Sequence, residues 1–236
     1  IKYRGIERYI ENLRKMFVAM AQDLRVILIK FADRLHNLQT LYALPRNKQI
    51  RIASEVLEIY APIANRLGMY EMKGELEAEA FKYLQPKEYN WLKNLIETHF
   101  KEKETILNNA QREVKKNLKE SDIKYLEVKG RIKQLYALYK KLLKHDKDIN
   151  RVYDFIAVRV IVKDIPACYA ALGAIHNKMK PLKGRIKDYI AQPKPNGYRS
   201  LHTTVFTPEK DIIEVQIRTE EMEDEAEYGV AAHWHY

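Results

Sequence analysis

The sequence has little of what disulfide-bonded, secreted or membrane-spanning proteins contain. It has one cysteine, Cys168, among 236 residues, which excludes an internal disulfide framework and is typical of a reducing cytoplasm. No apolar run approaches the ~20 residues that span a bilayer. The first ten residues are polar and amphipathic, unlike a signal peptide. We therefore expect a cytoplasmic protein with no membrane partner and with one large or two small domains.

Acidic residues are scarce in the middle of the chain. The net charge is +10, but residues 121–204 carry 18 basic and 7 acidic side chains, whereas residues 205–236 carry 2 basic and 9 acidic ones. The middle block is therefore expected to bind anions. The acidic end segment has two explanations at this stage. It forms a solvated helix face, or it brings carboxylates near the basic block.

The stretch over 180–204 combines positive charge with loop-forming residues. It holds six Lys or Arg and one acid, Asp188, together with three prolines and two glycines, so much of it is expected to be ordered loop. Tyr198 directly follows an Asn-Gly step, where a sharp turn can present an exposed, flat ring. Cations for phosphates and an aromatic face for a base suit a nucleotide. On composition alone, a solvated basic loop between two strands fits equally well.

The first half of the chain is predicted to be entirely α-helical. Apolar residues at helical spacing predict helices over 6–20, 23–44 and about 49–60. From there to residue 84 the pattern predicts further packed helices. Residues 86–120 form one long, highly charged helix, with a proline near its start.

The pattern changes after residue 120. Alternation predicts a strand over 124–129, helical spacing returns over 132–144, and a β-branched run predicts a buried strand over 155–162. The remaining elements are a helix over 166–178, strands over 201–207 and 212–218, and a helix over 219–233. This order predicts a mixed sheet flanked by helices, and for the whole chain an α+β fold.

Two carboxylates are candidates for a metal site. Asp154 lies at the start of the apolar strand, and alternation places Glu214, Gln216 and Arg218 on one face of a later strand. Phosphoryl or pyrophosphoryl transfer needs a divalent metal, and Mg²⁺ favours one or two protein carboxylates. From the residues alone, the solvated side of a sheet explains the same pattern.

The spacing of Asp154 and Arg159 sets a condition on a shared site. An unbroken strand would put the two side chains on opposite faces, so a shared site needs a bulge or a late strand start.

Several motifs occur together in one order along the chain. They are FADRLHN at 31–37, GRIK at 130–133, YD at 153–154, GRIKDYI at 184–190, PKPNGYRSLHTT at 193–204, EVQIRT at 214–219 and AEYGVAAHW at 226–234. This set resembles the RelA/SpoT family, whose members make and degrade the bacterial alarmone (p)ppGpp. The resemblance covers nearly the whole chain, and its motifs are highly specific.

The resemblance implies two parts and one reaction. Residues 1–84 would be the C-terminal helices of an HD-type hydrolase domain with a central helical bundle. Residues 85–236 would be a synthetase domain with a nucleotidyltransferase-like fold of the DNA polymerase β type. It would transfer the β,γ-pyrophosphate of ATP to the 3′-hydroxyl of GDP or GTP and release AMP. Ribosome or other regulators would act only through domains outside these residues. The rival reading is a non-catalytic RNA-binding or regulatory module, which needs no carboxylate pair.

The resemblance also assigns roles to the acids and to the cations that would bind ATP. Asp154 and Glu214 match the Mg²⁺-binding and catalytic acids of the synthetase. The implied ATP-binding residues are Arg131 and Arg159, around the adenine, and Lys133 and Lys141, at the phosphates. A planar guanidinium suits stacking, and a lysine suits a point charge on phosphate.

The guanine nucleotide would bind around the basic loop. The implied residues are Lys187, Lys194, Asn196, Tyr198, His202 and Gln216, with the ring of Tyr198 stacked on the base. Arg185-x-Lys187-Asp188 resembles the form found in bifunctional members, and differs from the acidic Glu-x-Asp-Asp form of dedicated synthetases.

A remnant of a second active site is implied near the start of the chain. Asp33 resembles an Mn²⁺ ligand of the HD-type hydrolase, and Asn37 a residue near its nucleotide. That metal also needs a His and a His-Asp pair from earlier helices, but no histidine precedes His36. We therefore expect an incomplete hydrolase site that binds no Mn²⁺, which only a complete hydrolase domain would hold.

Overall fold

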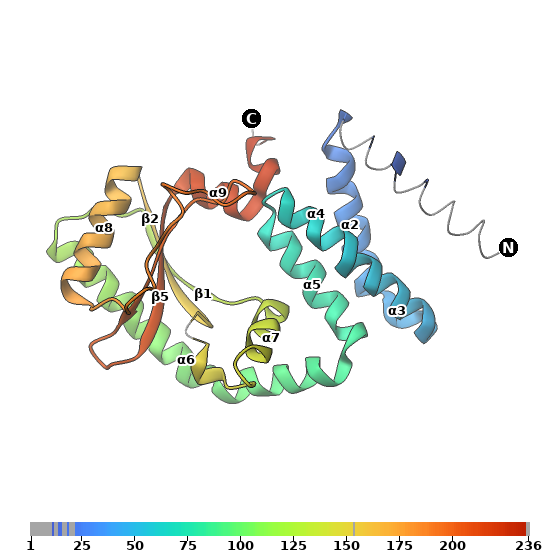
Figure 1. Cartoon of the computed structure of the whole chain (residues 1–236), viewed down its shortest axis with the longest axis horizontal. Helices are drawn as coiled ribbons and strands as arrows, with labels where there is room; N and C mark the ends of the chain where they lie inside the picture. The colour runs from blue at the N-terminus through green and yellow to red at the C-terminus, as the bar shows by residue number, and fades with distance from the viewer. Residues whose placement is uncertain (1–10, 12–13, 16–17, 19–21, 153, 235–236) are drawn as a thin grey trace.

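Helices make up the first half of the described chain, and a five-stranded sheet with its own helices makes up the second (Figure 1). The computed structural model describes residues 11, 14–15, 18, 22–152 and 154–234. The helix predicted over 6–20 therefore lies almost entirely outside the described residues. The predicted α+β class, with the helical part first, is confirmed.

Short helices surround the first of two buried hydrophobic clusters. They are α2 (Arg25–Gln39), a 3₁₀ turn (Leu41–Ala43), α3 (Arg46–Glu55), a π-helical turn (Val56–Tyr60), α4 (Ala61–Arg66) and α5 (Tyr70–Leu84). Phe31, Leu38 and Leu76 are fully buried among them. Pro62, which has no N–H to donate, lies in the first turn of α4, directly after the π turn. The helices predicted over 23–44 and 49–60 are thus present, but each changes its helical type before its predicted end.

One long helix, α6 (Pro86–Glu120), joins the helical part to the sheet and has the bounds that the sequence predicts. Its apolar stripe, which includes Leu92 and Val114, is buried in the second hydrophobic cluster together with the sheet. Phe81 of α5 belongs to the same cluster. The domain boundary between residues 84 and 85 therefore stays a prediction. Within the described ranges, no helix combines the length and the apolar character that crossing a membrane requires.

The sheet is mixed, as predicted. Its strands are β1 (Glu127–Ile132), β2 (Ile156–Val162), β3 (Lys187–Asp188), β4 (Leu201–Phe206) and β5 (Ile212–Thr219), in the spatial order β1-β2-β5-β4-β3. Strands β2 and β5 are parallel, and the other neighbours are antiparallel. Strand β1 begins three residues later than predicted, where its pairing with β2 begins. The sequence does not predict β3, because two residues are too few to show alternation.

Helices cover the apolar face of this sheet. The remaining helical elements are α7 (Leu135–Leu143), α8 (Ile165–Lys178), α9 (Glu220–Tyr228) and a 3₁₀ segment (Gly229–Trp234). Helices α6 and α8 pack on buried residues of β2, β4 and β5. In Figure 1, α8 lies to the left of the sheet and α6 beneath it, whereas α5 and α7 lie to its right. The opposite, polar face of the sheet is therefore turned toward α5 and α7.

Helix α9 ends at a glycine that the packing requires. Gly229 has a φ of +57°, and a Cβ atom there would lie 2.1 Å from the carbonyl oxygen of Leu67. The next residue, Val230, donates its N–H to that same oxygen at 3.0 Å. The helix predicted over 219–233 therefore stops at Tyr228 and continues as the 3₁₀ segment, next to the end of α4.

Candidate active site

The strand register gathers polar side chains on one face of the sheet. On β5, Glu214, Gln216 and Arg218 alternate with buried apolar residues, and hydrogen bonds join them in succession. Arg159 of β2 and His202 of β4 are both register partners of Gln216, from opposite sides. Register partners on neighbouring strands point to the same face. The prediction that the three β5 residues share one face is therefore confirmed, and two further strands extend that face.

A cavity opens on this polar face. Ten of the twelve side chains that the sequence assigns to the synthetase site line it: Arg131, Lys133, Asp154, Arg159, Lys187, Lys194, Tyr198, His202, Glu214 and Gln216. Lys141 lines an adjoining hollow that shares Asp154 and Glu214 with the cavity. Residues from all five strands, from the basic loop and from the helical part thus meet at one place.

Asp154 lies in a turn just before β2, which begins at Ile156. This late strand start lets it share the cavity with Arg159 without a bulge. Its Oδ2 atom accepts a hydrogen bond from Lys133 Nζ at 2.8 Å and another from Lys141 Nζ. Burial alone would raise the pKa of Asp154, but the charges and hydrogen bonds of both lysines lower it below its usual value. The other oxygen, Oδ1, is buried and has no hydrogen-bond partner among the described residues.

Glu214 is the second acid of the cavity. Its Oε1 atom accepts a 2.6 Å hydrogen bond from Gln216 Nε2 and lies 3.3 Å from His202 Nδ1. Burial would raise the pKa of Glu214, but the contacts with His202 and Gln216 lower it. The pKa of His202 is lowered, chiefly because burial disfavours the imidazolium, with Arg218 and Lys194 acting in the same direction. Glu214 is therefore ionised near neutral pH, and His202 is neutral.

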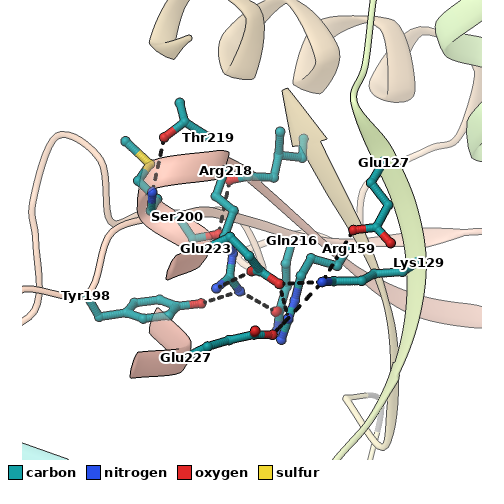
Figure 2. A network of polar contacts seen from close by, with 12 residues as sticks. Glu127, Lys129, Arg159, Tyr198, Ser200, Gln216, Arg218, Thr219, Glu223 and Glu227 are labelled. Atoms are coloured by element: carbon teal, nitrogen blue, oxygen red, sulfur yellow. Dashed lines mark hydrogen bonds and ion pairs between the residues drawn. The ribbon is translucent and has the colours of Figure 1, made fainter. Parts of the chain in front are cut away.

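Carboxylates of α9 hold two cations at the edge of the cavity (Figure 2). Arg159 Nη1 contacts Glu223 Oε1, and it lies 2.9 Å from Glu227 Oε1. Lys129 Nζ lies 2.8 Å from the same oxygen of Glu223. Of the two explanations for the acidic end segment, the one that brings carboxylates to the basic block is thus confirmed. Sequence reasoning did not select Lys129, Glu223 or Glu227, although the acidic excess over 205–236 signals this role.

The ring of Tyr198 is buried, so the prediction of an exposed ring is wrong. Only 9% of Tyr198 is exposed. The ammonium of Lys194 lies 4.6 Å from the ring centroid, and the edge-on ring of Tyr70 lies 5.4 Å away. Gly197, with a φ of +81°, closes a tight turn over 194–197 that folds the loop back against the sheet. The turn predicted from Asn-Gly is present, but it directs the ring inward.

Asn196 is the other predicted residue that does not line the cavity, and it lies in a neighbouring hollow that shares Tyr70 and Tyr198 with the cavity. Its Nδ2 atom donates a 2.9 Å hydrogen bond to the carbonyl of Asn65 and another to the hydroxyl of Tyr70. The side chain of Asn196 therefore ties the basic loop to the end of α4 and the start of α5. Lys187 and Lys194 do line the cavity, and burial together with the nearby charge of Lys187 lowers the pKa of Lys194.

The residues predicted for the hydrolase remnant lie elsewhere, on α2. Asp33 and His36 are exposed, and Asn37 is partly exposed. None of the three lines the cavity. Over the ranges that the structure describes, there is no group of three or more His, Cys, Asp or Glu side chains that could hold a metal ion.

The chain is similar to known proteins in both of its parts. Residues 130–236 match the family described as the region found in RelA/SpoT proteins, and residues 4–70 match the HD domain. A GTP pyrophosphokinase of Myxococcus xanthus and a probable guanosine-3′,5′-bis(diphosphate) 3′-pyrophosphohydrolase of Synechocystis are each 48% identical over 230 residues. Both alignments cover 98% of this chain and 30% of the relative. The bifunctional (p)ppGpp synthase/hydrolase SpoT of Escherichia coli is 46% identical, with 33% of it covered. The chain thus spans about a third of these relatives.

Solved structures show a more distant similarity. The small alarmone synthetase 1 of Bacillus subtilis, bound to its product pppGpp, is 19% identical with a TM-score of 0.42. The alignment covers 57% of this chain and 76% of that one. A GTP pyrophosphokinase family protein of Streptococcus pneumoniae is 21% identical with a TM-score of 0.41, covering 57% and 71%.

Proposed function

Because this chain belongs to the RelA/SpoT family, we propose that its sheet cavity is a (p)ppGpp synthetase site. The reaction transfers the β,γ-pyrophosphate of ATP to the ribose 3′-hydroxyl of GDP or GTP and releases AMP. The observation that carries the proposal is the placement of two acids, Asp154 and Glu214, in one cavity lined by basic side chains. An anion-binding module without chemistry has no need to bury carboxylates among the cations that attract its ligand.

The two acids fit a divalent cation. Asp154 offers a buried Oδ1 that has no hydrogen-bond partner among the described residues, and Glu214 lines the same cavity with a lowered pKa. Mg²⁺ is usually bound by one or two carboxylates together with substrate phosphates and water. When bound, it supplies charge neutralisation and polarises the transferred group. We therefore assign Asp154 and Glu214 as its protein ligands.

The cations around Asp154 support an ATP-phosphate site. Lys133 and Lys141 both contact one oxygen of Asp154, so two positive charges face one negative charge there. This excess positive charge attracts a polyphosphate. The ammonium groups that now donate to Asp154 would then donate to the phosphate oxygens. Arg131 and Arg159 would hold the adenine. The ion pairs of Arg159 with α9 are made by Nη1, at the edge of the guanidinium, and the planar face of a guanidinium suits stacking on a base.

The acceptor nucleotide would bind on the β3–β4 side of the cavity. Lys187 of β3 is the register partner of His202 on β4, and both side chains line the cavity. For guanine to stack on Tyr198, the Lys194 ammonium must move from its place over the ring toward a phosphate. Gln216 contacts Glu214 and so lies beside the reacting group. We assign Asn196 to holding the loop in position, because its side chain contacts the helical part.

Glu214 would act as the general base. The 3′-oxygen attacks the β-phosphorus of ATP, its proton passes to Glu214, and the bond from that phosphorus to the bridging α-oxygen breaks, so that AMP leaves. A lowered pKa keeps Glu214 ionised and able to accept the proton. The positive charges around the cavity stabilise the charge that develops on the transferred group.

Product analysis tests the proposal directly. The purified chain is incubated with ATP labelled on its β-phosphate, GDP or GTP, and Mg²⁺, and the nucleotides are separated. We expect AMP and a guanine nucleotide that has gained two phosphates, formed in equal amounts. Label transferred as a single phosphate, or ATP hydrolysis that is independent of the acceptor, would contradict the assignment. The acceptor that gives the higher turnover identifies the preferred substrate.

A further inference from the structure

Five side chains in the cavity wall form a closed ring of polar contacts. Arg218 Nη2 donates to the hydroxyl of Tyr198 at 3.1 Å and to Gln216 Oε1 at 2.8 Å. The Tyr198 hydroxyl lies 2.7 Å from His202 Nε2, and His202 Nδ1 lies 3.3 Å from Glu214 Oε1. Gln216 Nε2 closes the ring with its 2.6 Å bond to that same Oε1 atom. Two branches from one guanidinium nitrogen therefore end on one oxygen of the general base.

Arg218 is held deep beneath the cavity floor. It is 1% exposed and is the largest fully buried side chain among the described residues. Its Nη1 atom lies 3.1 Å from Glu223 Oε2, so a carboxylate of α9 balances its charge (Figure 2). Its guanidinium carbon lies 5.2 Å from the centroid of the Tyr198 ring. Burying a charge costs free energy unless the charge is paired and hydrogen-bonded. The burial of Arg218 at this point therefore indicates a specific role for its hydrogen bonds.

Arg218 fixes the orientation of both of its uncharged partners. Because Arg218 already donates to the Tyr198 oxygen, that oxygen is supplied with a donor, and its own proton is directed to His202. At Gln216, the bond from Arg218 fixes which end of the amide faces Glu214.

We propose that Arg218 is a positioning residue of the synthetase site, which orients the Tyr198 hydroxyl and the Gln216 amide and thereby presents Glu214 to the acceptor hydroxyl. The proposal rests on the proposed function: a parent chain that makes no ppGpp would contradict that function, whereas an active parent with an unaffected Tyr198→Phe variant contradicts only the role of Arg218. Because both contacts to Glu214 are made to Oε1, Oε2 is the oxygen that this arrangement presents for the proton or the metal. Arg218 is 1% exposed, so in this proposal it acts through its two partners.

Steady-state kinetics separate positioning from general support of the fold. Arg218→Met keeps the length of the side chain but removes its donors, and Tyr198→Phe keeps the ring but removes the hydroxyl. Both should lower kcat by roughly 10- to 100-fold, with the KM for ATP changed less than about two-fold. Arg199→Met is the matched control, since Arg199 Nη2 pairs with Glu225 of α9 at 2.9 Å outside the cavity. It should leave kcat within about two-fold of the parent.

If Arg218→Met fails to fold, the kcat of Tyr198→Phe still tests the proposal, because this substitution removes only one buried hydroxyl. A Tyr198→Phe variant with parental kcat overturns the proposal. So does an Arg199→Met variant that loses as much kcat as Arg218→Met, because the loss then reflects the attachment of α9.

Discussion

Lys133 and Asp154 are joined by a 2.8 Å hydrogen bond between Nζ and Oδ2, although 21 residues separate them. The lysine that the family resemblance assigns to ATP phosphates thus neutralises the acid that the same resemblance assigns to the metal. Lys141 contacts the same oxygen. The charges that we assign to a polyphosphate and to its metal therefore compensate one another. Binding of substrate would then exchange these contacts for new ones and would not bury unpaired charge.

The ring of Tyr198 gives the first prediction. Tyr198→Ala should raise the KM for GDP or GTP by roughly 5- to 100-fold, because stacking on a base is worth about 1–3 kcal/mol. The KM for ATP should stay within about two-fold, since the adenine site is assigned to other side chains. Initial rates with each nucleotide varied in turn measure both constants. Equal losses for the two nucleotides would mean that the buried ring supports the fold and contacts neither base.

The attachment of Arg159 to α9 gives the second prediction. Glu227→Gln removes one carboxylate from Arg159, with which it makes a 2.9 Å contact. Arg159 is then held less firmly, so the KM for ATP should rise by roughly two- to five-fold, as expected for about 0.5–1 kcal/mol from a partly exposed ion pair. The matched control is Glu225→Gln on the same helix, which pairs with Arg199 instead. A rise in the KM for ATP of the same size in both variants would contradict the role assigned to Glu227.

The third prediction concerns stability and pH. The pKa of His202 is lowered, mainly by burial, and burial also lowers the pKa of His176. Between their lowered values and the usual value of 6.5, the unfolded chain binds protons that the folded chain does not. The free energy of unfolding should therefore rise as the pH is raised from about 5.5 to about 7.5.

Urea unfolding at several pH values within that window measures this slope. His202→Gln and His176→Gln should each reduce it, because each removes one of the groups that titrate. The acids with lowered pKa, Asp154 and Glu214, lose their contribution only at lower pH, below their usual values, and so do not interfere. Stability that is constant or falls with pH in this window would show that these histidines are protonated in the folded chain.

The fourth prediction concerns hydrolysis. Asp33 and His36 are exposed on α2, and two such groups on one helix bind Mn²⁺ weakly. The 236-residue chain should therefore release no pyrophosphate from ppGpp at any Mn²⁺ concentration, even though curated relatives carry hydrolase names. Incubation with labelled ppGpp and Mn²⁺ checks this. Release of pyrophosphate that Asp33→Ala abolishes would mean that other residues complete the site.

The sequence predicts those features whose causes are local. The bounds of α6 follow from a proline at its start and a regular apolar stripe, and the polar face of β5 follows from simple alternation. The acids and cations of the cavity lie in short motifs that are recognisable one by one. The role assigned to each motif residue stays a prediction.

The sequence does not predict features that arise when distant segments meet. Tyr198 is buried because Tyr70 of α5 and the floor of the sheet enclose it, and Tyr70 precedes it by 128 residues. Asn196 leaves the cavity for a carbonyl of Asn65, 131 residues away. Strand β3 exists only through its pairing with β4. The ring around Arg218 likewise needs β4, β5 and the basic loop to be in place before its contacts can be seen.

The measurement that tests the central claim most directly is turnover of ATP and GDP by variants of the two acids. Asp154→Asn and Glu214→Gln keep the shape of each side chain and remove its charge, and each should lower kcat by roughly 10²- to 10³-fold, or about 2.7–4 kcal/mol. Glu209→Gln, on an exposed turn outside the cavity, is the control and should match the parent. Retained folding is checked by circular dichroism. Loss of AMP and ppGpp formation in both acid variants alone is the result that we predict. Parental turnover in either folded variant would contradict the assignment of this cavity as a pyrophosphoryl-transfer site.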